Sequence, residues 1–246
     1  MLIVLPPSET KVEGGEGGAL DLARLSFPRL TKPRRSLASA VRRLARRPEE
    51  MAAALKLGPR LAFEIDRNRA LTTSPTMPAL QRYTGVLYDA LDVASLSPDA
   101  LGFAASHLAV HSALFGLVGA GDPIPAYRLS HDSRLEPSVK SVWGSSIARE
   151  LTERPGLVLD LRSEGYVALG PAIGNPDAHY LHVVSEGPNG AKRALNHFNK
   201  KGKGEFTRAL LAQGEDFASV PDLIEWATAS GFRLGLRDDG SLELVV

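Results

Sequence analysis

The chain opens on an apolar run, MLIVL, which is followed at once by the polar and glycine-containing segment PPSETKVEGGEGG. A short continuous apolar run that ends in a turn signal is typical of a strand buried on both faces of a sheet. We therefore expect Met1 to Leu5 to form an interior strand. The glycines after it predict a loop that is flexible or lies close to a ligand.

Helical periodicity begins after Pro33. The segment from Arg34 to about Arg46 predicts a basic amphipathic helix, because its apolar residues share one face: Leu37, Ala40, Val41 and Leu44. Helical patterns recur at 49–70, 78–91 and 138–153. Ser97-Pro98-Asp99 is a capping signal for a helix that runs towards Ser106, and shorter helices are expected at 206–213 and 222–229.

Strand signals alternate with these helices. We expect strands at about Leu108 to Ser112 and in GLVLDL, and two hairpins that turn at Pro188-Asn189-Gly190 and at Asp238-Asp239-Gly240. The pattern contains no repeat, heptad or low-complexity linker. It predicts an α/β fold with mixed α+β character, in which one compact domain over residues 1–246 has a mixed sheet surrounded by helices.

Composition excludes several classes of protein. The 246 residues include no cysteine, so disulfides, thiolate metal sites and a cysteine nucleophile are excluded. The first residues lack the basic region of a signal peptide, and no apolar stretch approaches the roughly 20 residues that span a bilayer. We expect a soluble cytoplasmic protein that does not enter a membrane.

The net charge is only +1, but the charges are segregated along the chain. Two clusters are basic, and acids gather near the C-terminus, an arrangement that allows a local positive face for a polyanion. The first basic cluster comprises Arg29, Lys32, Arg34, Arg35, Arg42, Arg43, Arg46 and Arg47. The second comprises Lys192, Arg193, His197, Lys200, Lys201, Lys203 and Arg208.

The stretch KKGKGEFTR, residues 200–208, carries the densest charge. Between a predicted hairpin and a predicted helix, it would be a loop that leads into a helix N-terminus, where lysines, free amides and the helix dipole all suit a phosphate. It lacks the spacing of a P-loop. We expect Lys200, Lys201, Lys203 and Arg208 to contact phosphates; the alternative is a solvated basic loop.

Four further arginines are candidates for phosphate contact. Arg42 and Arg46 lie on one side of the predicted basic helix at i, i+4 spacing, which could follow a phosphate backbone or could simply be a solvated face. Arg128 and Arg134 follow a turn. For these two, burial with hydrogen bonds to carbonyl groups is an equal alternative.

Other chemistry has weaker support. His107 and His111 have a spacing that could hold a metal on a helix, but their segment is predicted as strand and no third ligand is near. Ser163, Glu164 and Tyr166 at a strand end could serve acid–base chemistry or simple hydrogen bonding. We expect no metal, no cofactor and no catalytic residue, and we favour binding over catalysis.

Several blocks of the sequence, in order, resemble the YaaA family of bacterial peroxide-stress proteins. The blocks are MLIVLPPSETK, the segment with Tyr83, Gly85, Tyr88 and Leu91, HLAVHSALFGLVGAGDPIPAYRLSHDSRL, the pair Trp143-Gly144, LRSEGY, and KKGKGEFTR. The chain differs from the family pattern in the first loop, where Glu9 replaces a lysine and Lys11 lies two positions later. It also has Thr84 where the family has a lysine.

The resemblance implies a single-domain α/β protein that binds DNA through a basic cleft. It also implies a helix-hairpin-helix-like element and a role in limiting free iron during peroxide stress.

Two functions therefore compete. The first is binding of duplex or branched DNA, independent of sequence, by a monomer. The second is an enzyme that acts on a nucleotide or another phosphorylated small molecule through the first loop, Arg128 and the Lys200 segment. A long basic groove would favour the first, and a small closed pocket with perturbed carboxylates would favour the second. Direct iron binding is disfavoured by the absence of cysteine and of a close His/Asp/Glu set.

Overall fold

The first strand forms the centre of the sheet in the computed structural model, which describes residues 1–186, 192–193 and 196–246. Strand β1 (Leu2–Leu5) is buried at every position and pairs in parallel with β3 (Leu108–Ser112) on one side and with β6 (Val158–Asp160) on the other. The apolar run MLIVL is thus covered on both faces, as expected for an interior parallel strand.

The remaining strands extend the sheet in the order β4-β3-β1-β6-β7-β10-β9, with β8 paired to β7. Antiparallel β4 (Gly116–Gly119) forms one edge. Beyond β6 lie the parallel strands β7 (Ala178–Glu186) and β10 (Leu242–Val245), and then antiparallel β9 (Arg233–Leu236). A separate antiparallel pair joins β2 (Met77–Pro78) to β5 (Pro123–Ile124).

Both predicted hairpins are confirmed by strand pairing. Ser185 pairs with Arg193 between β7 and β8 (Lys192–Arg193), and Glu243 pairs with Gly235 between β10 and β9. The predicted turn at 188–190 lies outside the described residues.

The order of the strands creates a switch point. From β1 the chain crosses to β3 on one side, and it returns to β6 on the other side of β1. The connections therefore diverge between the parallel neighbours β1 and β6, and in open α/β sheets this leaves a crevice at the carboxyl ends of the two strands.

Helices cover the sheet and extend beyond it. The predicted basic helix is confirmed as α1, with Leu37, Ala40 and Val41 buried, and the hydroxyl of Ser97 caps α6 at 3.2 Å from the amide of Ala100. The predicted helix at 138–153 is broken at Gly144, whose φ of 49° separates α7 from α8. The helices are α1 (Thr31–Leu44), α2 (Pro48–Ala54), α3 (Phe63–Arg69), α4 (Ala79–Arg82), α5 (Val86–Leu91), α6 (Pro98–His107), α7 (Val139–Trp143), α8 (Ser146–Thr152), α9 (Glu164–Val167), α10 (Asn196–Gln213) and α11 (Val220–Ala229), with 3-10 turns at Leu22–Arg24, Pro28–Leu30, Pro59–Leu61 and Val93–Ser95.

The prediction of a loop at KKGKGEFTR is wrong, because the whole stretch lies inside α10. Two glycines at alternate positions lower helix propensity, which favoured a loop. Their role is close packing. A Cβ on Gly204 would lie 2.2 Å from the carbonyl oxygen of Leu87 in α5, and one on Gly202 would lie 2.9 Å from Val246. Tertiary contact therefore overrides local propensity here.

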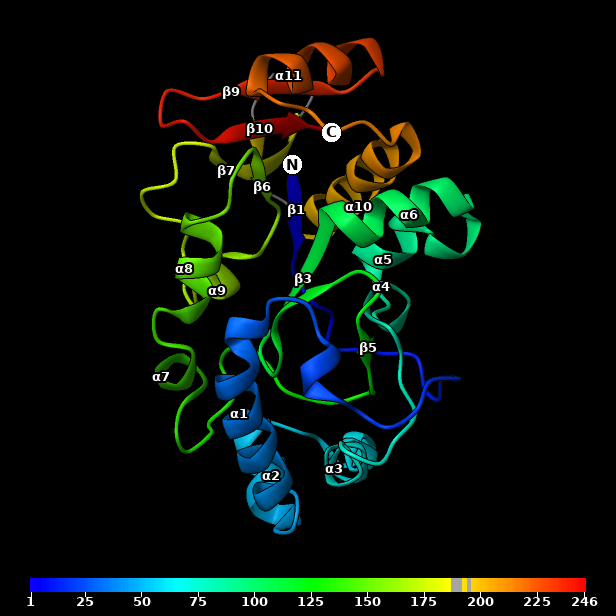
Figure 1. Cartoon of the computed structure of the whole chain (residues 1–246), viewed down its shortest axis with the longest axis vertical. Coiled ribbons are helices and arrows are strands. Elements are labelled where there is room, and N and C mark those ends of the chain that lie inside the picture. The colour runs from blue at the N-terminus through cyan, green and yellow to red at the C-terminus, as the bar shows by residue number, and fades with distance from the viewer. Residues whose placement is uncertain (187–191, 194–195) are drawn as a thin grey trace.

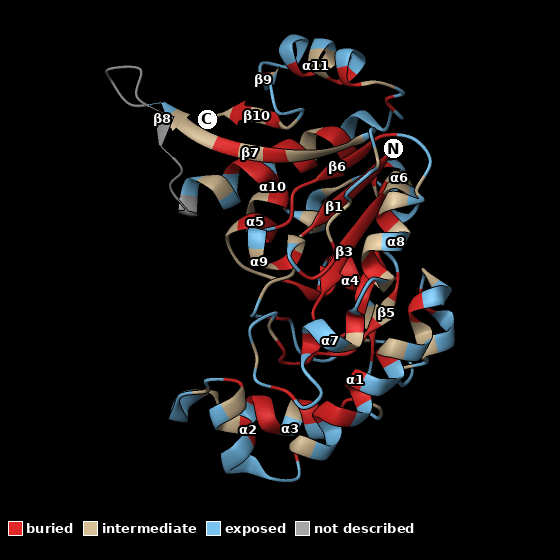
Figure 2. Cartoon of the chain, turned by 90° about the vertical axis from the view of Figure 1, so that its left-hand side faces the viewer, coloured by how far each residue is buried: buried red, intermediate tan, exposed pale blue. Residues whose placement is uncertain are grey.

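One buried core unites these elements into a single domain. The buried residues form a continuous cluster from β1 through α1, α5 and α10 to α11 and β10. Helices α1–α3 lie at the opposite end of the molecule from β9 and α11 (Figure 1). Burial follows β1, β3 and β6 and the helix faces turned towards them (Figure 2). Within the described part of the chain, no helix combines the length and the apolar character needed to cross a bilayer.

The packing of α10 predicts opposite effects for the same substitution at two helical glycines. Gly204→Ala should lower the free energy of unfolding by about 1–3 kcal/mol, because the added methyl group has no space against α5. Gly102→Ala in α6 should raise it by about 0.5–1 kcal/mol, because nothing lies within 4 Å of the added carbon. Urea denaturation of both variants measures this; a stabilised Gly204→Ala would contradict the packing role.

Candidate functional site

A cleft of about 850 Å³ lies where the switch point predicts it, at the carboxyl ends of β1 and β6. Six segments that are distant in sequence line it. They are residues 6–9 after β1, residues 84–88 at the start of α5, residues 129–132, residues 163–166 after β6, Tyr180 of β7, and Asn199, Lys200 and Lys203 of α10.

Lys203 forms the buried floor of this cleft. Its side chain lies beneath the surface with 4% of the residue exposed, and its Nζ donates to the carbonyl oxygens of Leu161 at 2.9 Å and Arg162 at 3.3 Å. The same Nζ lies 5.2 Å from the ring centre of Tyr180. Burial lowers the pKa of Lys203 to about 8, against the opposing attraction of Asp160 and Glu164. An ammonium has three N–H groups, so one remains available after these two bonds.

The other basic residues of the predicted stretch lie in different surroundings. Lys200 is exposed one helical turn before Lys203 and also lines the cleft, whereas Lys201 is exposed and forms an ion pair with Glu205 at 3.2 Å. Arg208 donates to the carbonyl oxygens of Leu91 at 3.0 Å and Asp92 at 2.9 Å. Arg208 thus caps the end of α5, and in this position its guanidinium points to protein carbonyls.

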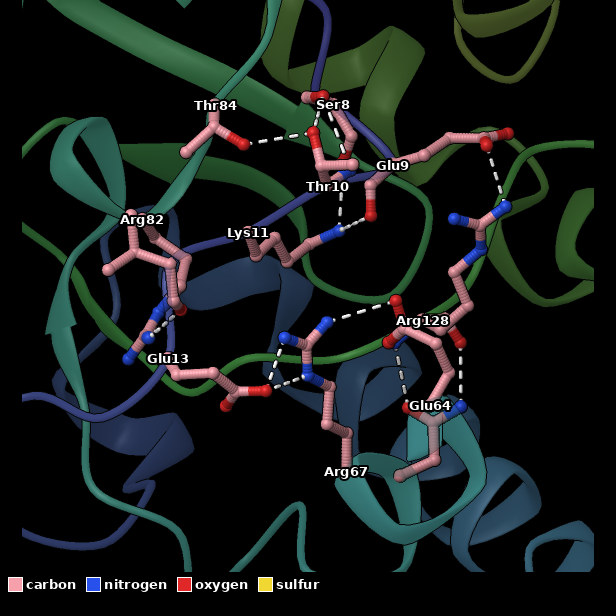
Figure 3. Close-up of polar contacts among 12 residues, drawn as sticks. Ser8, Glu9, Thr10, Lys11, Glu13, Glu64, Arg67, Arg82, Thr84 and Arg128 are labelled. Atoms are coloured by element: carbon pink, nitrogen blue, oxygen red, sulfur yellow. Dashed lines mark hydrogen bonds and ion pairs between the residues drawn. The ribbon is translucent and has the colours of Figure 1, made fainter. Parts of the chain in front are cut away.

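Arg128 is also engaged inside the protein. It is 9% exposed, and its Nη2 donates to Oε2 of Glu9 at 2.6 Å (Figure 3). The side-chain amide of Asn68 holds the backbone of Arg128 through both its N–H and its carbonyl group. Arg128 therefore fixes the first loop to the segment that begins the 129–136 loop.

Lys11 anchors the same first loop from below (Figure 3). Its Nζ donates to the carbonyl oxygens of Ser8 at 2.8 Å and Glu9 at 3.2 Å, and it lies 4.3 Å from the ring centre of Tyr127. Burial lowers the pKa of Lys11 to about 7; Glu64 opposes this shift and Arg128 adds to it. The displaced lysine of the first loop is therefore a buried support of the cleft wall.

Two arginines complete this support. Arg82 is fully buried and donates to the carbonyl oxygens of Val12 at 2.5 Å and Gly14 at 2.8 Å. Arg67 forms ion pairs with Glu13 and, at 2.9 Å, with Glu64 (Figure 3). The loop after β1 is thus held in one conformation by four cations, although its sequence is rich in glycine.

A second hollow, the groove, lies beside the cleft. It has a volume of about 350 Å³ and is bordered by α1, α2 and residues 134–136. Arg43, Arg47 and Arg134 line it, together with Glu50 and Glu136. Arg47 is paired with Glu50 at 2.8 Å, while Arg43 and Arg134 are exposed and have no ion pair among the described residues.

Arg42 lies on α1 and Arg46 lies in the turn that follows it, and neither borders the groove. Both are exposed, and within the described ranges neither contacts an acidic side chain. The structure therefore brings Lys200, Lys203 and the Arg128–Glu9 pair together at the cleft. It places Arg134 at the groove, where its backbone N–H donates to the carbonyl oxygen of Ala54 in α2, and it leaves Arg42 and Arg46 exposed to solvent.

The charges that line the cleft are largely balanced. Arg128 neutralises Glu9, and Lys56 binds Asp132 at 2.6 Å. Lys200 and Lys203 then face Glu164, which has no hydrogen-bond or ion-pair partner in the part of the chain that the structure describes. The cleft can therefore hold an anion beside a group that accepts hydrogen bonds.

Sequence reasoning missed part of this site. Ser163, Glu164 and Tyr166 have a usable signal, because they follow a predicted buried strand, and parallel strands end at a common edge. Thr84 and Tyr180 have no such signal in the sequence, although both line the cleft. Tyr180 reaches it only because Asp160 of β6 pairs with Tyr180 of β7.

The buried lysines predict a pH dependence of stability. Lys11 has its pKa lowered from 10.5 to about 7, so between about pH 7.5 and 9.5 the unfolded chain binds a proton that the native protein does not. The free energy of unfolding should therefore rise with pH in this window, and Lys203 should add to the rise in its upper part. Lys11→Met should flatten the slope by about 1 kcal/mol per pH unit.

Urea denaturation at several pH values measures this slope, with Lys201→Met as the exposed control. The window stops below pH 10 because the raised pKa values of Tyr83 and Tyr127 act in the opposite direction there. Equal slopes for Lys11→Met and the parent would contradict the burial of a titrating Lys11.

Comparison with known proteins gives a consistent assignment. Residues 1–235 match the family described as peroxide stress protein YaaA. A UPF0246 protein of Corynebacterium glutamicum (strain R) is 44% identical over 237 residues, which is 94% of this chain and 93% of the relative. UPF0246 proteins of Corynebacterium efficiens and Streptomyces coelicolor are 40% and 39% identical over 244 and 241 residues, covering 97% and 95% of this chain and 96% and 92% of the relatives. The chain belongs to the YaaA family of peroxide stress proteins.

Proposed function

We propose that this protein acts in peroxide stress as a cytoplasmic protein that binds DNA through its phosphates, independently of sequence. The surface involved is the basic strip, which we define as Lys200, Arg134 and Arg43. One observation carries the proposal. The loop at 129–136 borders the cleft with residues 129–132 and the groove with residues 134–136, so one loop lines both hollows.

The chemistry of the basic strip supports backbone contact. Its three cations are exposed, and none has an acidic partner in the described residues. Such side chains can exchange counterions with phosphates at little cost, because no internal ion pair has to break. Arg42 on α1 and Arg46 in the turn after α1 would widen the contact. Long flexible cations at a surface position a duplex but carry no base code.

The family resemblance adds a structural element and an effect on iron. We assign the helix-hairpin-helix-like element to α2, which borders the groove, and α3, to which α2 is joined by the segment that contains Gly58. Neutralising phosphates releases the cations condensed on DNA. Ferrous iron held on the backbone would be released with them, so peroxide would react with iron at a greater distance from the bases.

Binding should depend steeply on salt and weaken in variants of the basic strip. Arg43→Ala with Arg134→Ala should weaken binding equally for unrelated duplexes and lower the salt slope by about 1 per lost phosphate contact. Fluorescence anisotropy at several salt concentrations measures both. Arg42→Ala with Arg46→Ala tests the exposed cations of α1 and of the turn after it in the same way.

The control is Arg233→Ala with Arg237→Ala, which removes the same charge from β9 and the adjoining turn at the other end of the molecule (Figure 1). This control should bind with almost parental affinity. Equal weakening by the two double variants would mean that net charge alone matters, and it would overturn the strip.

In cells, deletion of the gene should increase killing by hydrogen peroxide, and an iron chelator should relieve the killing. The parental gene should restore survival, whereas Arg43→Ala with Arg134→Ala should not, because it would leave iron on the DNA. Counts of surviving colonies measure the effect. If the Arg43→Ala, Arg134→Ala variant restores survival fully at the same protein level, resistance to peroxide does not depend on DNA binding by the basic strip.

A further inference from the structure

The cleft contains a built anion site that shares only Lys200 with the basic strip. Lys203 is buried on the floor of the cleft with one N–H beyond its bonds to Leu161 and Arg162, and Lys200 lies one turn away on the same helix. A buried ammonium that is only partly satisfied gains from an additional acceptor. Two cations at i, i+3 can hold one phosphate group from two directions.

A free carboxylate lies on the same wall as this anion site. Glu164 follows β6, lines the cleft and has no hydrogen-bond or ion-pair partner among the described side chains. A carboxylate only accepts hydrogen bonds at neutral pH, so it selects a ligand group with O–H or N–H donors. In dinucleotide-binding folds an acidic residue near the strand ends binds the ribose hydroxyls in this way.

Aromatic side chains are the third feature of the cleft that suits a ligand. The ring of Tyr166 lies edge to face with His131 at 5.1 Å between centres, and both residues line the cleft. His131 lies so close to Gly165 that a Cβ there would be 2.4 Å from the imidazole. The glycine therefore allows the imidazole to lie flat on the backbone. His131 is exposed whereas Tyr166 is buried, so the imidazole supplies the ring face that can stack with a planar ring, a contact that is typical of nucleobase binding.

We propose that the cleft binds a 5′-mononucleotide, with the phosphate at Lys200 and Lys203, the sugar hydroxyls at Glu164, and the base against the exposed ring of His131. A mononucleotide is the small ligand class that uses all three features; a sugar phosphate uses two, and inorganic phosphate uses one. The volume of about 850 Å³ lies within the range of small-molecule sites. This inference goes beyond DNA binding and does not rest on it.

The test is calorimetric titration of the full chain with AMP, GMP, adenosine, ribose 5-phosphate and inorganic phosphate. At least one mononucleotide should bind, with adenosine and ribose 5-phosphate at least tenfold weaker. Adenosine that binds as tightly as AMP would overturn the phosphate site. Ribose 5-phosphate that binds as tightly as AMP would overturn the base wall, and failure of both mononucleotides to bind would overturn the proposal.

Neighbouring lysines provide the matched variants. Lys200→Ala should weaken the binding of the better mononucleotide at least fivefold, whereas Lys201→Ala should leave it unchanged, because only Lys200 lines the cleft although both lysines are exposed on α10. If Lys200→Ala and Lys201→Ala weaken binding equally, the nucleotide is attracted by the general surface charge of α10 and not by the cleft, and the proposal is overturned.

Two further arms identify the sugar contact and separate this proposal from DNA binding. Glu164→Ala should weaken binding of the ribonucleotide but not of its 2′,3′-dideoxy analogue; equal loss for both would contradict the hydroxyl contact. Arg43→Ala with Arg134→Ala should leave the mononucleotide affinity unchanged. Loss of mononucleotide binding in that double variant would mean that the cleft and the strip form one site.

Discussion

The contact between Lys203 and the end of β6 determines where α10 lies, and with it the shape of the cleft. The carbonyl groups of Leu161 and Arg162 follow the last paired residue of β6, so they need donors from outside the sheet. A lysine ammonium can reach them only if its helix comes close. Gly202 and Gly204 on either side of Lys203 make this approach possible, since a methyl group at either position would collide with α5 or the sheet. The main role of the stretch KKGKG is therefore packing. Its two glycines allow α10 to approach α5 and the sheet closely enough to bury Lys203.

Several other cations serve the same structural purpose, so the number of basic residues overstates the basic surface. Arg34, Arg82 and Arg162 are fully buried. Arg34 belongs to the predicted basic helix but donates to the carbonyl oxygens of Phe115 at 2.7 Å and Leu117 at 2.5 Å. A guanidinium supplies five donors in a fixed plane, which suits it to collect carbonyl groups from loops and strand ends. The basic strip is drawn from the cations that are not used in this way.

The sequence predicts the features that depend on local patterns, and it does not predict those that depend on contacts between distant segments. The strand MLIVL, the strand at 108–112, both hairpins and the amphipathic face of α1 follow from local patterns, and all are confirmed. The helix at 200–208 and the break at Gly144 were not predictable. The first depends on a partner more than 100 residues away, Leu87, and the second on a turn inside a continuous helical pattern. The composition of the cleft was also only partly predictable, because it depends on contacts between segments that are distant in sequence. Ser163 and Glu164 are visible as residues that end a strand, but their meeting with Lys203 and Tyr180 depends on the order of the sheet.

The two proposed ligands share Lys200, and this sharing has a thermodynamic consequence. Lys200 lines the cleft and also belongs to the basic strip, and it is exposed with no acidic partner in the described chain. A phosphate monoester in the cleft would neutralise it and place a negative charge beside the path proposed for the DNA backbone. Each ligand would then weaken the other by the same factor, because coupling between two binding equilibria is reciprocal. Arg43 and Arg134 line the groove and not the cleft, so their contribution to DNA binding would persist. Occupancy of the cleft would therefore reduce affinity for DNA without abolishing it, and the level of the small ligand would set how readily the protein leaves DNA.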